Sequence, residues 1–159
     1  MATRQFVGML ALATILSAGS AVAAEETLKF RLVVTGDPAA TVQVPNIEGR
    51  SLSTGHYTGV AVLEDGRIAF KDFVGVTDNG GAEGNFFGYS TYTFLNGHSL
   101  TLKYTGDWGA KGFVGNYEVL SGTGAYEGAA GTGQFDTVEE PWDGAYLYDV
   151  TIKLIHSDS

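Results

Sequence analysis

Apolar and polar residues alternate through most of this chain, and this alternation limits what it can fold into. In the segment 28–34 the even positions are apolar, and Lys29 and Arg31 lie between them. The segment 146–154 repeats the pattern. A period of two places successive side chains on opposite faces of a β-strand. No later segment has a convincing apolar period of 3.6 residues, so the sequence predicts an all-β fold.

Two dipeptides divide these alternating segments at places where a chain can reverse. Asp65 precedes Gly66, and Asn96 precedes Gly97. Both pairs are typical of two-residue hairpin turns, in which both turn residues take positive φ. The region 36–54 is rich in small polar residues and predicts a long loop or an irregular edge. About eight strands are expected, at 28–34, 55–64, 67–77, 85–95, 99–105, 113–120, 126–138 and 146–154.

A glycine-rich stretch, residues 115–135, joins two of these expected strands. A phosphate-binding loop would have to open a helix, and the glycines that follow Gly128 disfavour one. Glycine within strands instead indicates bends or bulges, which a closed barrel needs. We therefore expect an eight-stranded antiparallel β-barrel, whose interior is filled by side chains or holds one small ligand.

The first 24 residues have the features of a secretory signal peptide. Arg4 provides a positive charge, residues 6–18 are mostly apolar, and small residues at 21–24 suit cleavage after Ala23 or Ala24. The apolar segment is too short for an ordinary membrane span, so we expect no stable membrane insertion. The sequence thus predicts a signal peptide at 1–24, a single domain at 25–159, and a secreted or periplasmic location.

The composition disfavours several classes of function. The formal net charge is −9 and the chain has no cysteine. A basic surface for nucleic acid is therefore not expected, and disulfides and a cysteine nucleophile are excluded. His56, His98 and His156 are too widely spaced to form a recognisable metal-binding motif. We expect neither a metal site nor a cofactor.

Three segments resemble the superfamily of barrels that includes allene oxide cyclases and dirigent proteins: residues 92–102, 115–131 and 146–155. The most specific part is Gly-Thr-Gly-Ala-Tyr-Glu-Gly-Ala at 122–129. The resemblance covers about residues 27–156. It implies an eight-stranded antiparallel, calycin-like barrel, usually a homotrimer, with a largely apolar cavity. The cyclase motif of Glu and Asn followed by a proline has no clear counterpart here, and the cyclase cysteine is absent. The resemblance therefore supplies no catalytic residue.

Asp72 is the most unusual polar residue in the expected strands. It shares a face of its strand with Ile68, Phe70, Val74 and Val76. If that face lines the barrel, Asp72 places a carboxylate in an apolar cavity, where burial would raise its pKa. If the face is external, Asp72 meets solvent or a neighbouring subunit, and parity alone does not decide. Asp72 is the one candidate catalytic residue.

Tyrosines on the apolar faces of other strands complete the candidate site. Core packing is the ordinary role of such residues, but their hydroxyls also suit a ligand cavity. Tyr146 belongs to this class as well. The candidate ligand-binding residues are Asp72, Tyr92, Tyr104 and Tyr148.

Three functions fit these features. The first is an exported barrel that binds a small hydrophobic molecule. The second is a cyclase or isomerase that acts mainly by shape, with one or two polar groups. The third is a structural protein that assembles into homo-oligomers through its outer face. The contents of the barrel would distinguish them.

Overall fold

The computed structural model describes residues 24–138 and 144–156. Apart from Ala24, the predicted signal peptide lies outside these residues, so it stays a prediction. The elements are β1 (Ala24–Thr35), β2 (Pro38–Gln43), β3 (Ser51–Leu63), β4 (Ile68–Asn79), β5 (Gly84–Phe94), β6 (Ser99–Gly109), β7 (Gly112–Thr123), the 3₁₀ turn η1 (Gly124–Tyr126), β8 (Ala130–Val138) and β9 (Ala145–His156).

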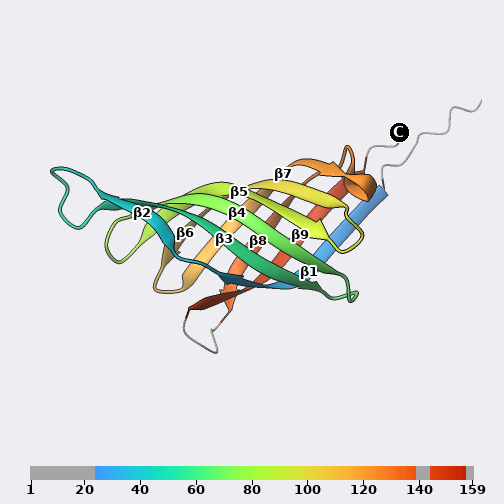
Figure 1. Ribbon diagram of the computed structural model, residues 1–159, viewed down its shortest axis with the longest axis horizontal. Helices are drawn as coiled ribbons and strands as arrows, with labels where there is room; N and C mark the ends of the chain where they lie inside the picture. Colours follow the sequence, from blue (N-terminus) through green and yellow to red (C-terminus); the bar gives the residue numbers. More distant parts are fainter. Residues whose placement is uncertain (1–23, 139–143, 157–159) are drawn as a thin grey trace, which may run out of the picture.

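Eight of the strands form a closed antiparallel barrel, as predicted (Figure 1). Strands β3 to β9 pair in sequence order, and β1 closes the barrel by pairing with both β9 and β3. The remaining strand, β2, pairs with the first part of β3. The region 36–54, expected to be a loop or irregular edge, therefore contains β2 and the start of β3. In Figure 1 the β2–β3 hairpin projects beyond one end of the barrel.

The barrel interior is filled by side chains in the half that η1 covers. Leu28, Leu100 and Leu154 are at most 2% exposed. Tyr126 in η1 is also buried, and Arg67 Nη1 donates a 2.8 Å hydrogen bond to its hydroxyl. The burial of this apolar surface is the main source of stability in a barrel without disulfides. No helix long and apolar enough to cross a bilayer occurs among the described residues.

Both predicted hairpins are present, but each has a three-residue loop instead of a two-residue turn. The backbone N–H of Leu63 donates to the carbonyl of Arg67, and that of Phe94 donates to the carbonyl of His98, each at 2.9 Å. Of the predicted turn residues, Gly66 and Gly97 have positive φ, whereas the preceding aspartate and asparagine do not. A three-residue loop that ends in a left-handed glycine gives the same reversal.

The glycine-rich stretch forms most of β7, the turn η1 and most of β8. Gly124 has φ +61° and Gly128 has φ +70°, a conformation that residues with a Cβ rarely adopt. A Cβ on Gly124 would also meet the imidazole ring of His98. The predicted bend is therefore present, and it brings Tyr126 over the closed end of the barrel.

Candidate ligand-binding cavity

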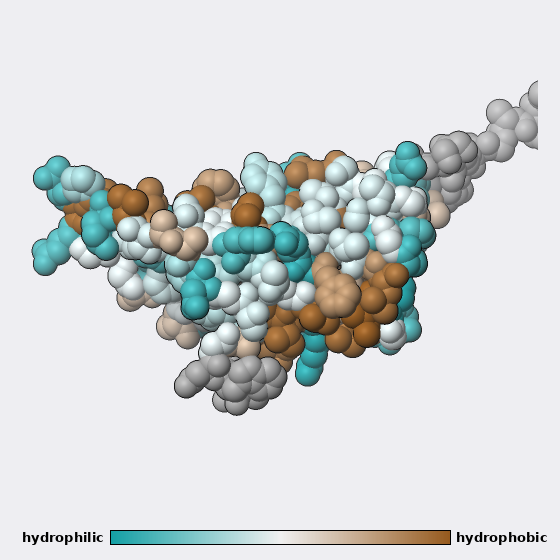
Figure 2. Space-filling model, viewed as in Figure 1, coloured by the Kyte–Doolittle hydropathy of each residue, from teal (hydrophilic) through white to brown (hydrophobic). Residues whose placement is uncertain are grey.

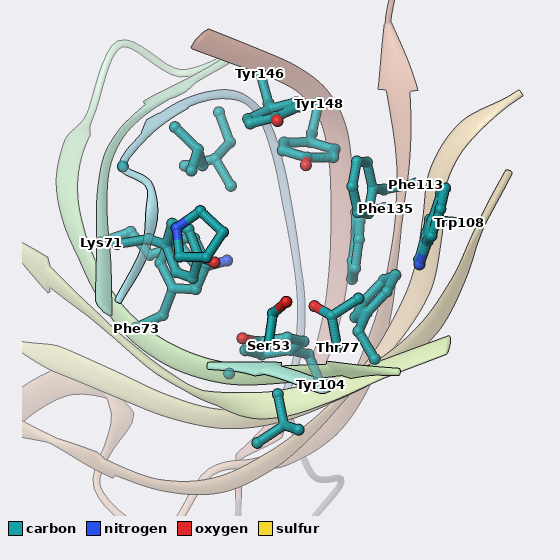
Figure 3. Close-up of a pocket in the computed structure, with 18 of the residues that line it drawn as sticks. Ser53, Lys71, Phe73, Thr77, Tyr104, Trp108, Phe113, Phe135, Tyr146 and Tyr148 are labelled. Atoms are coloured by element: carbon teal, nitrogen blue, oxygen red, sulfur yellow. The ribbon is translucent and has the colours of Figure 1, made fainter. Parts of the chain in front are cut away.

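The other half of the barrel is hollow and contains a cavity of about 280 Å³. Its walls come from the ends of β1, β4, β6 and β8 and the starts of β3, β5, β7 and β9. Much of the lining is aromatic: Tyr57, Phe73, Phe86, Tyr104, Trp108, Phe113, Tyr117, Phe135, Tyr146 and Tyr148. In Figure 3 the labelled side chains surround an open space, with Lys71 and Phe73 opposite Phe113 and Phe135.

Glycines in β4 and β5 make room for one wall of this cavity. A Cβ on Gly75 or on Gly88 would collide with the hydroxyl of Tyr104. The Tyr104 hydroxyl itself donates a 2.9 Å hydrogen bond to the backbone carbonyl of Val74. The ring of Tyr104 is therefore held against the wall by its own hydrogen bond and presents mainly carbon to the cavity.

A lysine forms part of the inner end of the cavity. Lys71 points inward from β4 and its side chain is only 5% exposed. Its Nζ donates a 2.8 Å hydrogen bond to the hydroxyl of Tyr117 in β7. That hydroxyl is 3.1 Å from the hydroxyl of Tyr92 in β5. Three strands thus bring an amine and two phenols into one hydrogen-bonded chain where the hollow half of the barrel meets the packed half.

Aromatic rings surround the Lys71 amine. Its Nζ lies 4.2 Å from the ring centroid of Phe73 and between 5.2 and 5.4 Å from those of Tyr92, Tyr104 and Tyr117. A cation within about 6 Å of a ring is attracted by the negative face of the ring. These contacts offset part of the cost of burying the ammonium group, but they do not replace a counterion.

The surroundings of Lys71 change its protonation. Burial lowers the pKa of Lys71 from 10.5 to about 7, because an apolar environment disfavours the charged form. Burial also raises the pKa values of Tyr92 and Tyr117, so both phenols stay neutral near pH 7. Among the described residues that line the cavity, the single carboxylate is Asp37, which follows β1 at the open end. The amine can therefore gain or lose a proton near neutral pH.

The expectation that Asp72 points into the cavity is wrong. Its side chain is 68% exposed on the outer face of β4, where it lies 3.0 Å from Nε2 of His56. Phe70 and Val74 do share its face, as predicted, but they too are exposed. Both faces of β4 carry apolar side chains. The pattern of apolar residues in this strand therefore did not show which face points into the barrel.

The three candidate tyrosines all point inward, although they do not surround Asp72. Tyr104 and Tyr148 line the cavity. Tyr92 lies behind it, and its hydroxyl is hydrogen-bonded to the hydroxyl of Tyr117. Sequence reasoning missed Lys71, which shares the inner face of β4 with Ala69 and Phe73. Strand pairing could have found it, because Lys71 lies directly opposite Tyr92, a residue already placed on an inner face.

The described residues contain no group of three or more potential metal ligands. The histidines lie apart. His56 is outside the barrel beside Asp72, His98 contacts the Asn96 turn, and His156 lies 3.3 Å from Glu26. The polar chemistry of the cavity therefore comes mainly from Lys71, Tyr117 and the residues at its open end.

Comparison with known proteins identifies the fold. No family profile matches the sequence and no curated protein is similar to it. Among solved structures, the pterocarpan synthase dirigent protein GePTS1 superposes with a TM-score of 0.58 at 15% identity, covering 94% of this chain and 100% of its own. The related protein PsPTS1 gives 0.52 at 16% identity, with coverage of 86% and 97%. A DUF3224 protein of unknown function from Shewanella oneidensis gives 0.53 at 17% identity, with coverage of 82% and 96%.

These likenesses identify the fold as a dirigent-like β-barrel. They do not single out the allene oxide cyclases, which the sequence resemblance had placed beside the dirigent proteins. At such low identities the shared property is the fold, because function depends on the residues of each site.

Proposed function

We propose that this protein binds a small hydrophobic molecule in the hollow half of its barrel. The observation that carries the proposal is the cavity of about 280 Å³ with mostly aromatic walls. Ligand sites are typically concave and largely apolar, with a few polar groups that orient the ligand. Lys71 and Tyr117 are such groups at the inner end, and Asp37 and Asn79 are at the opening.

A neutral fluorescent dye, N-phenyl-1-naphthylamine, tests this proposal. The dye brightens in apolar surroundings, and its titration gives a dissociation constant. Thr77→Trp introduces a bulky side chain into the cavity wall, and we expect it to weaken dye binding at least tenfold. Thr105→Trp places the same side chain on the exposed face of β6 and is the matched control. Equal binding by both variants would show that the dye lies elsewhere, and no binding by the unmodified protein would contradict the proposal.

A substrate-directing or isomerase activity is the second candidate, and the Lys71–Tyr117 pair favours it. An amine that titrates near neutral pH, hydrogen-bonded to a phenol, suits proton transfer to or from a bound molecule. The pterocarpan synthases named above are dirigent proteins with the same barrel. Mass spectrometry identifies the molecules that co-purify with the protein. Measuring the same molecules before and after incubation with the protein then distinguishes an unchanged ligand from a converted substrate.

Homo-oligomerisation is a further part of the proposal, and the outer face of β3, β4 and β5 supports it. Large hydrophobic side chains are exposed there, and two pairs of them lie opposite each other on neighbouring strands: Val60 with Phe70, and Val74 with Tyr89. Phe87 on β5 is exposed as well. Figure 2 shows hydrophobic surface gathered over the ends of β3 and β1 at its lower right. Contiguous apolar surface of this kind often marks an interface. Light scattering on the purified domain measures its oligomeric state.

Export completes the proposal, with a secreted or periplasmic location after removal of the leader. The charged start, apolar segment and small residues of 1–24 support it. The intact mass of the mature protein tests it, and a chain that still carries residues 1–18 would contradict it.

A further inference from the structure

We infer that the cavity selects small aromatic acids, whose carboxylate binds to the amine of Lys71 and to the adjoining phenol. This inference rests on the proposed function and names the chemical class of its ligand. The hydrogen-bond donors at the inner end of the cavity and the charge buried there both support it.

The inner end of the cavity has more donors than acceptors. A charged lysine has three N–H donors and no acceptor. Among the described residues, Lys71 makes one hydrogen bond, to the hydroxyl of Tyr117. Two donors of the ammonium group are therefore left. The Tyr92–Tyr117 pair has two hydroxyl hydrogens and uses one between its oxygens, so one phenolic hydrogen is left as well. A ligand group that accepts several hydrogen bonds complements this arrangement.

The charge of the same region favours an anion over a neutral acceptor. Four aromatic rings surround Lys71, and none of them can neutralise it. Asp37, the single lining carboxylate of the described residues, is at the opposite end of the cavity. A buried ammonium without a counterion is costly. A ligand carboxylate would supply the counterion, and charge-assisted hydrogen bonds of this kind are about twice as strong as neutral ones.

The walls determine the rest of the ligand. Phe73, Phe113 and Phe135 face the open space and leave room for a flat ring between them (Figure 3). Aromatic pairs gain free energy beyond the area they bury when the rings are offset or edge to face. The volume of about 280 Å³ suits one or two rings but not a long lipid chain. A small aromatic carboxylic acid satisfies both ends of the cavity.

The probes for the test are cinnamate and cinnamamide, which have nearly the same shape and differ in charge. Both are titrated as competitors of N-phenyl-1-naphthylamine on the folded domain at pH 6.5. We expect cinnamate to bind at least tenfold more tightly than cinnamamide, since the amide nitrogen brings donors to a region that already has too many. Lys71→Met should abolish this preference. Lys153→Met, on the exposed face of β9, is the matched control and should retain it.

A pH series on the unmodified protein gives a second test that needs no variant. The groups facing Lys71 are the phenols of Tyr92, Tyr104 and Tyr117 on β5, β6 and β7, and burial raises the pKa of each. Burial also raises the pKa of Tyr57, which lines the cavity on β3. Burial lowers the pKa of Lys71 to about 7, so Lys71 is the group that titrates in this pH range. Affinity for cinnamate should fall about tenfold for each pH unit above 7, whereas affinity for cinnamamide should not follow this trend.

The possible outcomes separate this inference from the proposed function. If the dye binds but cinnamate has no advantage over cinnamamide, the inference is wrong and the hydrophobic cavity stands. If the advantage persists in Lys71→Met, another group supplies the charge and the inference is again wrong. If neither the dye nor either competitor binds, the proposed function fails too.

Discussion

Replacing Lys71 with methionine should make the folded protein more stable at neutral pH. The two side chains are similar in length and volume, but methionine carries no charge and needs no hydrogen bond. In the folded protein Lys71 is buried with one hydrogen bond and four ring contacts. In the unfolded chain its ammonium group is hydrated. The burial that defines the inner end of the cavity therefore has a cost in stability that the variant removes.

The shift in pKa gives the size of this cost. Lys71 has a pKa of about 7 in the folded protein and 10.5 as an ordinary lysine. Between these values the unfolded chain binds a proton that the folded protein lacks, so the free energy of unfolding rises with pH. At 1.36 kcal/mol per pKa unit, the cost is about 5 kcal/mol well below pH 7, where both states are charged. The unmodified protein should accordingly gain roughly 3 kcal/mol between pH 7 and 9.5.

Urea unfolding, followed by tyrosine and tryptophan fluorescence, measures this change at several pH values. The range should end near pH 9.5, because burial raises the pKa values of Tyr92 and Tyr117 and stability will fall as unfolded tyrosines ionise. We expect Lys71→Met to be more stable than the unmodified protein at pH 7 and to lose most of the rise with pH. Lys153→Met is again the control. A Lys71→Met variant with the same rise would refute the assignment of the titration to Lys71.

Two other substitutions test the geometry of the barrel. Gly124→Val should destabilise the protein by about 1–3 kcal/mol, because Gly124 has φ +61° and a Cβ there would meet His98; an unchanged melting temperature would contradict this. Asp72→Asn should change the free energy of unfolding by less than about 1 kcal/mol and leave dye binding unaltered, because the Asp72–His56 pair is exposed on the outer face. A loss of dye binding in Asp72→Asn would contradict this, because it would show that the carboxylate affects ligand binding in the cavity.

Much of the barrel could be predicted from the sequence, because alternation and turn residues are local properties. The alternation in 28–34 and 146–154 correctly predicts the inner faces of β1 and β9, where Leu28 and Ile152 are buried. The other face of each of these strands is mainly polar, with Lys29 and Arg31 on β1 and Asp149 and Lys153 on β9, so the pattern favours one assignment of the inner face. In β4 the exposed Phe70 and Val74 made the outer face look like the interior, and Lys71, on the opposite face, was therefore not among the candidate residues.

The site could not be predicted in the same way, because it depends on which strands lie opposite one another. Lys71, Tyr92 and Tyr117 are brought together by the pairing of β4 with β5 and by the closure of the barrel. The hollow space itself depends on glycines such as Gly88, where the missing Cβ makes room for Tyr104. Neither feature has a local sequence pattern.

A crystal structure of the protein soaked with cinnamate tests most directly whether the cavity binds aromatic acids. We predict one aromatic molecule in the hollow half of the barrel, with its ring beside Phe135 and its carboxylate within hydrogen-bond distance of Lys71 Nζ. An empty cavity at saturating cinnamate, or a molecule bound only on the outer face of the barrel, would show that the cavity is not a site for aromatic acids.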